Sequence, residues 1–272
     1  MLYGRCILYS TRCKESLAYI SMYTFSVGAL FKNEAHCIRE WVQHYIFHGA
    51  EHFYLINDGS TDDFMTQIRG YEDKVTVFTV DEPYYLGRQR NLYNRFLLPR
   101  LCETTWLLMV DLDEFVWSPI DIDLRNVLKI CNYLGQVQIH ERMFGSNGHD
   151  TQPKSLVESF TRRAINQSSR KYFIHNTYTF TSLNVHHADF EREEDVRDVT
   201  KCMFVDEDYF VYNHYKCQSR EFWDTVKCLR GDSDSFLTKR PEDFALFDLN
   251  EIEDLGLWEQ NKGLKLLEKI DE

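Results

Sequence analysis

Three carboxylates directly follow an apolar stretch. The run Trp106–Val110 leads into Asp111, Asp113 and Glu114. Concentrated negative charge is costly unless a cation neutralises it, and Asp oxygens are hard ligands that suit Mg²⁺ or Mn²⁺. On a strand, Asp111 and Asp113 would point the same way while Leu112 packs on the opposite face. We therefore expect a metal that holds a phosphorylated ligand here. For an isolated D-x-D pattern, an acidic turn that ends a strand is the alternative.

The composition limits the possible partners. The chain has 272 residues, of which 43% are hydrophobic, so it can bury one large core or a core plus a small lobe. Its formal charge of -12 argues against a nucleic-acid binder, which needs clustered Lys and Arg. Residues 231–272 carry much of the acidic excess. We predict no nucleic-acid partner.

The eight cysteines include no C-x-x-C pair, so we expect reduced thiols and no structural zinc. The longest uncharged stretch, residues 16–31, is shorter than the roughly 20 residues that a membrane-spanning helix needs. Residues 1–22 also lack the apolar region and cleavage site of a signal peptide. These features predict no integral membrane segment and a cytoplasmic location.

Strands and helices alternate in the first half of the chain. We predict strands over residues 23–31, 52–56, 74–80 and 105–110, and helices over 38–46, after the turn 57–63, and over 86–98. Gly49 should stop the first helix and Pro99 should close the third. This alternation predicts a doubly wound, mostly parallel sheet, whose ligands bind beyond the carboxyl ends of its strands. Asp58 and Asp111 both follow such ends.

The second half is less regular. Residues 124–131 have a helical pattern, 136–140 a strand pattern, and 143–149 form a Gly-containing loop of the kind that lines substrate clefts. Residues 251–270 predict a surface helix docked by one face. We divide the chain into an N-terminal extension (1–22), two halves of one domain (23–115 and 116–230) and an acidic helical tail (231–272).

Four motifs follow one another in the first half: Phe31-Lys32-Asn33-Glu34, Glu40-Trp41, Asp58-Gly59-Ser60-Thr61-Asp62 and Asp111-Leu112-Asp113-Glu114-Phe115. In this order they resemble the nucleotide-sugar glycosyltransferases of GT-A fold, and most of all those of the family 2 and family 92 type. The resemblance covers roughly residues 25–230. It implies that residues 23–115 are a nucleotide-sugar-binding half and residues 116–230 an acceptor-binding half of the same domain. It implies a Rossmann-like, doubly wound sheet with an acceptor-side α+β portion and a C-terminal helical tail.

The resemblance also implies the binding residues. Those implied to hold the nucleotide sugar are Phe31, Asn33, Glu34, Asp58, Arg88, Gln89, Asp111 and Leu112. For Arg88 and Gln89, a solvated helix face is an equal alternative. Asp111, Asp113 and His214 are the implied ligands of Mn²⁺ or Mg²⁺, and His186 and His187 compete with His214 for that role.

Relatives of this kind mostly invert the anomeric centre, which requires a carboxylate that deprotonates the acceptor hydroxyl. Asp189 is the first candidate for this base, with Asp150 and Glu158 as alternatives. Each could also be an ordinary surface acid. Arg162 and Arg163 could pair with the diphosphate or face solvent.

The predicted function is a metal-dependent glycosyltransferase that moves a sugar from a UDP-sugar to a carbohydrate or glycoconjugate acceptor. Walker, G-x-G-x-x-G and G-x-S-x-G motifs are missing, which argues against ATP hydrolysis, dinucleotide redox chemistry and serine hydrolysis. A non-catalytic binding protein of the same fold is one alternative. A sugar nucleotidyltransferase is a weaker one, because no basic Gly-rich loop follows the first strand.

Overall fold

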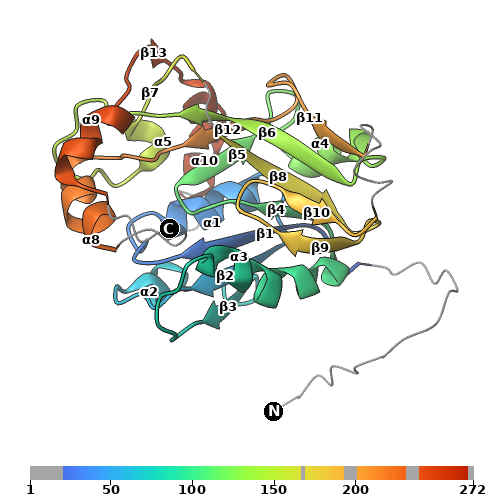
Figure 1. Cartoon of the computed structure of the whole chain (residues 1–272). Coiled ribbons are helices and arrows are strands. Elements are labelled where there is room, and N and C mark those ends of the chain that lie inside the picture. The colour runs from blue at the N-terminus through green and yellow to red at the C-terminus, as the bar shows by residue number, and fades with distance from the viewer. Residues whose placement is uncertain (1–20, 167–168, 193–200, 231–238, 269–272) are drawn as a thin grey trace, which may run out of the picture.

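The computed structural model describes residues 21–166, 169–192, 201–230 and 239–268. A nine-stranded sheet runs through the molecule in the order β3-β2-β1-β4-β8-β6-β12-β5, with β11 paired to β6 (Figure 1). Its strands are β1 (Tyr23–Phe31), β2 (His52–Asn57), β3 (Val75–Thr79), β4 (Thr104–Met109), β5 (Glu114–Trp117), β6 (Gln136–Met143), β8 (Arg170–His175), β11 (Cys202–Phe204) and β12 (Val211–His214). Two small sheets pair β9 (Phe180–Leu183) with β10 (Ala188–Phe190), and β7 (Arg162–Arg163) with β13 (Ile252–Glu253).

The prediction of a mostly parallel sheet is confirmed. Strands β1 to β4 are mutually parallel, and five of the eight pairings in the large sheet are parallel. β8 then inserts antiparallel to both β4 and β6. The carboxyl ends of β1 and β2 face the side of the molecule where α8 (Cys228–Arg230) lies (Figure 1).

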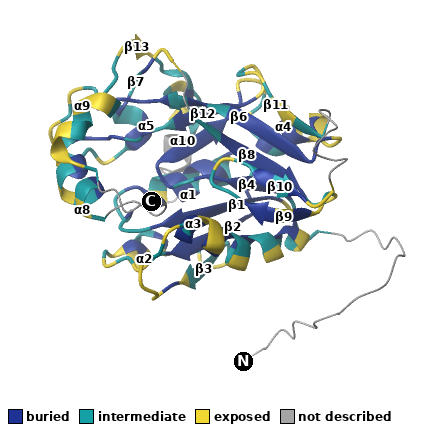
Figure 2. Cartoon of the chain, in the orientation of Figure 1, coloured by how far each residue is buried: buried dark blue, intermediate teal, exposed yellow. Residues whose placement is uncertain are grey.

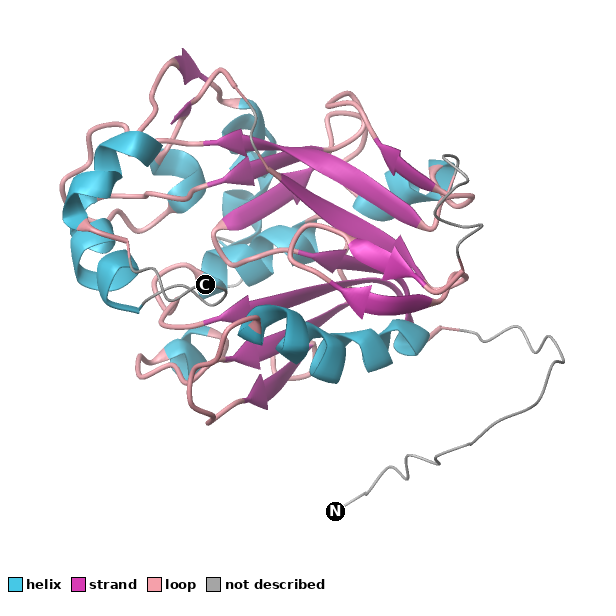
Figure 3. Cartoon of the chain, viewed as in Figure 1, coloured by secondary structure: helices cyan, strands magenta, loops and turns pink. Residues whose placement is uncertain are grey.

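Side-chain alternation along the strands builds two cores. In β4, Trp106 and Leu108 join one core, while Leu107 and Met109 join the other. The first core is covered by α1 (Ile38–Phe47) and α4 (Leu124–Ile130), and the second by α3 (Arg88–Leu92), the π-helix Tyr93–Leu97 and the β9–β10 hairpin. Helices thus cover both faces of the sheet (Figure 3), whose strands are largely buried (Figure 2).

Two predicted helix ends have different outcomes. Helix α1 stops as predicted, because Gly49 adopts a φ of 91° and its N–H bonds to the carbonyl of Ile46. The third helix does not close at Pro99. It passes into a 3₁₀ segment, Leu98–Glu103, with the proline near its start, because proline lacks an N–H but fits the first turn of a helix.

The C-terminal prediction is wrong at its start. Residues 252–253 form β13, paired with β7, and the helix α10 begins only at Gly256 and ends at Glu268. Backbone pairing explains the difference, because the N–H of Glu251 bonds to the carbonyl of Arg163. The tail also contains the 3₁₀ turn Pro241–Asp243 and α9 (Phe244–Phe247). Residues 1–20 of the predicted extension, and 231–238 and 269–272 of the tail, lie outside the described residues.

The remaining helices are short. They are α2 (Phe64–Gln67), α5 (Leu156–Ser159), α7 (Arg220–Phe222) and the π-helix Trp223–Lys227 that joins α7 to α8. In the described part of the chain, no helix has both the length and the apolar character needed to cross a bilayer.

Candidate active site

A cavity of about 420 Å³ lies where the first strands end. Six carboxylates line it: Glu34, Asp58, Asp111, Asp113, Glu114 and Glu141. Six basic side chains also line it: Lys32, Lys171, Lys216, Lys227, Arg230 and Lys239. Such a mixture of charges suits a ligand that combines a cation with an anionic group.

The acidic motif lies in a turn. β4 ends at Met109 and β5 begins at Glu114, so Asp111 and Asp113 are not on a strand as predicted. The two carboxylates face different partners. Asp111 accepts a hydrogen bond from Lys171 Nζ at 2.7 Å, and Asp113 accepts one from Lys227 Nζ at 2.7 Å. Both nevertheless line the same cavity, and Leu112 packs into the first core.

Helix α1, which carries the Glu40-Trp41 motif, holds this turn in place. Trp41 Nε1 donates to the carbonyls of Asp111, at 3.1 Å, and Glu114, at 3.0 Å. The Tyr45 hydroxyl donates to the Glu114 carbonyl as well, at 3.0 Å. The carboxylate of Glu40 accepts instead from Leu156 N–H at 2.7 Å, at the start of α5. The motif therefore acts by positioning the turn, and it does not line the cavity.

The loop that begins with Phe31-Lys32-Asn33-Glu34 and the turn that begins with Asp58 are joined by hydrogen bonds. Asn33, at a φ of 55°, accepts from the N–H of Thr61 at 2.8 Å, and its own N–H donates to Ser60 Oγ at 3.0 Å. Arg88 donates to Asp58 at 2.6 Å. Asn33 and Arg88 therefore shape the pocket without lining it. The other six residues implied to bind the nucleotide sugar line the cavity: Phe31, Glu34, Asp58, Gln89, Asp111 and Leu112.

Sheet register creates a possible metal site. β12 pairs with β5 so that His214 lies opposite Glu114. Ligand atoms of Asp113, Glu114 and His214 all lie within 4.8 Å of one another. Two carboxylates and an imidazole are a donor set that suits Mn²⁺. Asp111 is not in this group, although it lines the same cavity.

The electrostatics of this group are set by burial and by neighbouring cations. Burial opposes ionisation of Asp113, but Lys227, His214 and Arg230 outweigh burial and hold the pKa of Asp113 well below its usual range. Burial dominates at Glu114 and raises its pKa. At His214, burial disfavours the charged ring, yet Asp113 and Glu141 raise the pKa to about 9. His214 must therefore release a proton before it can bind a metal.

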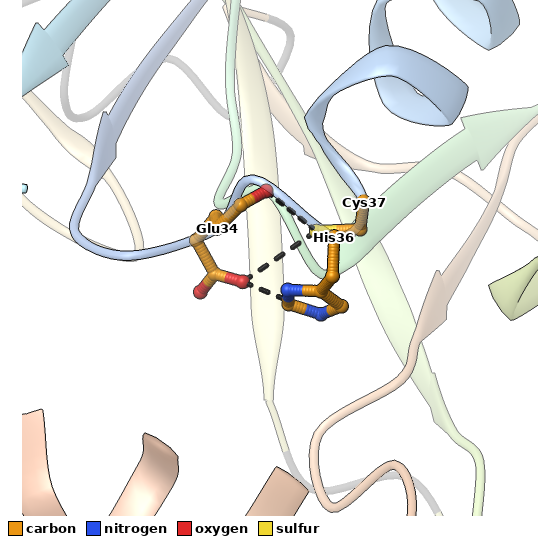
Figure 4. A group of neighbouring side chains, drawn as sticks. All are labelled: Glu34, His36 and Cys37. Atoms are coloured by element: carbon orange, nitrogen blue, oxygen red, sulfur yellow. Dashed lines mark hydrogen bonds and ion pairs between the residues drawn. The ribbon is translucent and has the colours of Figure 1, made fainter. Parts of the chain in front are cut away.

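A second cluster at the start of α1 consists of Glu34, His36 and Cys37 (Figure 4). His36 Nε2 lies 3.8 Å from Glu34 Oε2, and the Cys37 thiol donates to the same oxygen at 3.5 Å. Burial raises the pKa of Cys37 well above its usual value, which keeps the thiol protonated. Glu34 is also ion-paired with Arg230. These contacts make the cluster a hydrogen-bonded support of the pocket wall.

The three candidate bases lie outside the set of residues that line the cavity. Asp189, on β10, accepts from Asn184 Nδ2 at 2.8 Å and lies 3.1 Å from His187 Nε2. Asp150 is exposed and Glu158 is half-buried. Asp189 holds the loop whose His186 does line the cavity. The role of base stays a prediction for all three acids.

Arg162 and Arg163 contact the C-terminal segment rather than the cavity. Arg162 Nε donates to the carbonyl of Asn250 at 2.9 Å, and Arg163 Nε donates to Asp254 at 2.6 Å. Sequence reasoning missed the basic residues that do line the cavity. Lys171 carried a signal, because this charged residue directly precedes the aromatic and apolar residues Tyr172, Phe173 and Ile174 of its strand. Lys227 carried none, because its neighbour Asp113 is 114 positions away.

Comparison with known proteins identifies the family of this chain. The glycosyltransferase family 92 model matches residues 21–254. Family 92 proteins of Ricinus communis and Arabidopsis thaliana are 24% and 25% identical over 210 and 223 residues. Each match covers 74% of this chain and 36% of the relative, so the chain spans about a third of the length of these relatives.

Two solved structures are also similar. TarS of S. aureus in complex with UDP-GlcNAc is 15% identical, with a TM-score of 0.42, over 82% of this chain and 64% of that chain. The mannosyltransferase PcManGT of Pyrobaculum calidifontis, in complex with GDP-Man and Mn²⁺, is 16% identical, with a TM-score of 0.33, over 48% and 39%.

The helix-covered, mostly parallel sheet with an acidic turn at its carboxyl edge is the GT-A architecture expected from the motifs. With the match over residues 21–254, the chain belongs to glycosyltransferase family 92.

Proposed function

We propose that this chain transfers a hexose or pentose from a UDP-sugar to a carbohydrate or glycoconjugate acceptor, with a divalent metal and with inversion at the anomeric carbon. One observation carries the proposal. Asp58, which directly follows β2, the acidic turn with Asp113, and six basic side chains meet in one cavity of about 420 Å³. A nucleotide sugar needs these three elements together, for its nucleoside, its bound cation and its diphosphate.

The donor set of Asp113, Glu114 and His214 fits Mn²⁺ or Mg²⁺, with the imidazole favouring Mn²⁺. An ion held there would supply positive charge to the leaving diphosphate. Asp58 and Phe31 are proposed to seat the nucleoside. Asp189 is proposed to take the proton from the acceptor hydroxyl, whose oxygen then bonds to the anomeric carbon as the bond to the diphosphate breaks. The cytoplasmic location predicted from the sequence belongs to the same proposal.

Metal-dependent release of UDP from a panel of UDP-sugars tests this function, because hydrolysis is a slow side reaction of many transferases. We expect release with Mn²⁺ and none in EDTA. Binding of UDP and Mn²⁺ without any release would favour the alternative of a non-catalytic binding protein. Failure to bind either ligand would refute the proposed function.

A further inference from the structure

Lys227 occupies a position that the function described so far does not explain. The residue is buried, with 8% of its surface exposed, and its Nζ lies 2.7 Å from Asp113 Oδ2. It therefore neutralises the carboxylate that should bind the metal. A divalent ion and an ammonium group compete for the same oxygen atoms, because both need the negative charge of Asp113.

The charges that line the cavity disfavour a divalent ion that binds without an anion. Six carboxylates face six Lys and Arg side chains, so the cavity is close to neutral before any ligand binds. A divalent ion alone would add two positive charges to it. A divalent ion together with a diphosphate of charge about −2 leaves the total charge of the cavity unchanged. Because the ion then neutralises Asp113, the lysine that had paired with this carboxylate can move to the phosphate.

The backbone that carries Lys227 is well placed for such a move. Lys227 ends the π-helix Trp223–Lys227, and π-helical turns are frequent at functional sites. Trp223 is fully buried against Phe244 and Phe247, which fixes this helix. A fixed backbone with a four-carbon side chain lets Nζ change partners while the helix stays in place.

The neighbouring lysine is less suited to this role. Lys171 Nζ bridges two carboxylates, Asp111 at 2.7 Å and Glu114 at 3.0 Å, and its side chain is 2% exposed. Moving Lys171 would leave two acids without their shared cation, whereas moving Lys227 frees only the proposed metal ligand. Arg230, one turn after Lys227, also lines the cavity and pairs with Glu34. The segment from Lys227 to Arg230 thus presents two cations to the cavity.

We propose that Lys227 exchanges partners: it neutralises Asp113 in the ligand-free protein and binds the diphosphate of the donor once a metal occupies Asp113. This inference rests on the proposed function and names the residue that makes metal and nucleotide binding interdependent. Lys227 is thereby a binding residue for the leaving group.

Binding measurements on the purified chain test the exchange. We compare wild type with Lys227→Met, using Mn²⁺ titration by electron paramagnetic resonance and UDP titration by calorimetry. Without nucleotide, Lys227→Met should bind Mn²⁺ roughly tenfold more tightly, because Asp113 has lost its competing cation. With saturating Mn²⁺, the variant should bind UDP at least tenfold more weakly, while uridine, which lacks the diphosphate, should bind equally well.

Two controls accompany these titrations. Lys129→Met removes an exposed lysine on α4 that bonds to Asn126, and all three affinities should match wild type. Lys227→Arg keeps the charge and should retain most of the UDP affinity. Unchanged Mn²⁺ affinity in Lys227→Met, or an equal loss of UDP and uridine affinity, would overturn the exchange. Wild-type protein that binds neither UDP nor Mn²⁺ would instead refute the proposed function.

A second comparison includes a variant in which neither charge of the Lys227–Asp113 pair is left without its partner. Asp113→Asn frees Lys227 without a metal, and Asp113→Asn/Lys227→Met removes both charges. In metal-free buffer, Asp113→Asn should bind UDP more tightly than wild type, and the double variant should lose that gain. Equal UDP affinity of the single and double variants would also overturn the proposal.

Discussion

At the scale of single residues, the carboxylates of this chain differ sharply in their surroundings. Asp113 and Glu114 are both buried, yet cations hold the pKa of Asp113 low while burial raises the pKa of Glu114. Asp189 is 39% exposed in its side chain and is shared among Asn184, His187 and Arg90. In our proposal, these environments give the acids separate roles: metal binding for the first pair and proton transfer for Asp189.

Substituting Asp189 by Asn tests its role as base. A general base contributes about 10²- to 10⁴-fold to the rate, so Asp189→Asn should lower kcat for transfer by about two orders of magnitude or more. UDP affinity should stay within twofold of wild type. Steady-state transfer assays with a suitable acceptor measure kcat and KM separately, and calorimetry measures UDP binding.

Asp150→Asn and Glu158→Gln serve as comparisons in the same assay. If Asp189→Asn changes only KM by a few-fold, its role is to position the Asn184–His187 loop. If one of the other two variants shows the large kcat loss, that acid is the base in its place.

At the scale of elements, the motifs prove to be one connected support. Helix α1 reaches the acidic turn through Trp41 and Tyr45, and the loop after β1 bonds to the turn after β2 through Asn33. The residues that a motif search finds most readily are thus partly those that hold other residues in place.

Trp41→Phe separates this positioning role from aromatic packing. The variant keeps a buried ring but loses both hydrogen bonds to the turn carbonyls, which should reduce the free energy of unfolding by about 1 to 3 kcal/mol. Mn²⁺ affinity should fall about tenfold, because the turn that carries Asp113 is less firmly held. Urea unfolding and Mn²⁺ titration measure the two effects.

Trp106→Phe is the matched control, since Trp106 is equally buried and its Nε1 bonds to Asn132, away from the turn. It should lose stability without losing Mn²⁺ affinity. A Trp41→Phe variant with wild-type Mn²⁺ affinity would contradict the positioning role.

The elements also show what sequence patterns can and cannot predict. Strands β1, β2 and β4 and helix α1 were predictable, because each combines a local periodicity with a clear stop such as Gly49. The place of Lys227 beside Asp113, and of Glu141 beside His214, follows from pairings between distant segments. No local pattern records such pairings. The turn geometry of Asp111 and Asp113 was not predicted either. The strand ends at Met109, and the turn that follows is held by Trp41, which is 70 positions away from Asp111.

At the scale of the whole molecule, the two halves supply complementary charges to one cavity. The parallel strands position Asp58 and the acidic turn. The antiparallel strand β8 contributes Lys171, and the π-helix Trp223–Lys227 contributes Lys227. The chain carries a net charge of -12, yet its cavity is balanced. The lining of the cavity is therefore less acidic than the chain as a whole, which suits the anionic donor of our proposal.

Helix α10 of the C-terminal tail contacts two buried histidines of helix α1 and its C-cap. Asn261 of α10 donates to His44 Nδ1 at 3.1 Å, and its side-chain oxygen lies 3.1 Å from His48 Nε2. Burial lowers the pKa of His44 well below its ordinary value of 6.5 and also lowers the pKa of His48. The native state therefore holds both rings neutral, whereas the unfolded state takes up protons first as the pH falls.

The contribution of these two rings to stability should consequently be complete above pH 6.5 and should decline as the pH falls below that value. Each ring contributes up to about 1.4 kcal/mol per pH unit, so we expect a loss of about 1 to 3 kcal/mol between pH 7 and pH 5.5. Urea unfolding at both pH values measures it. His44→Gln, which removes one titrating ring, should reduce this loss. An equal loss in wild type and His44→Gln would contradict the assignment.

The central claim is that Asp113 holds a cation beside the leaving group of a UDP-sugar. Release of UDP from UDP-sugars, measured with and without Mn²⁺, tests it most directly when wild type, Asp113→Ala and the exposed-acid control Asp208→Ala are compared. We predict Mn²⁺-dependent release by wild type and Asp208→Ala, and at least a hundredfold loss in Asp113→Ala. Undiminished release by Asp113→Ala, or by wild type in EDTA, would contradict the claim.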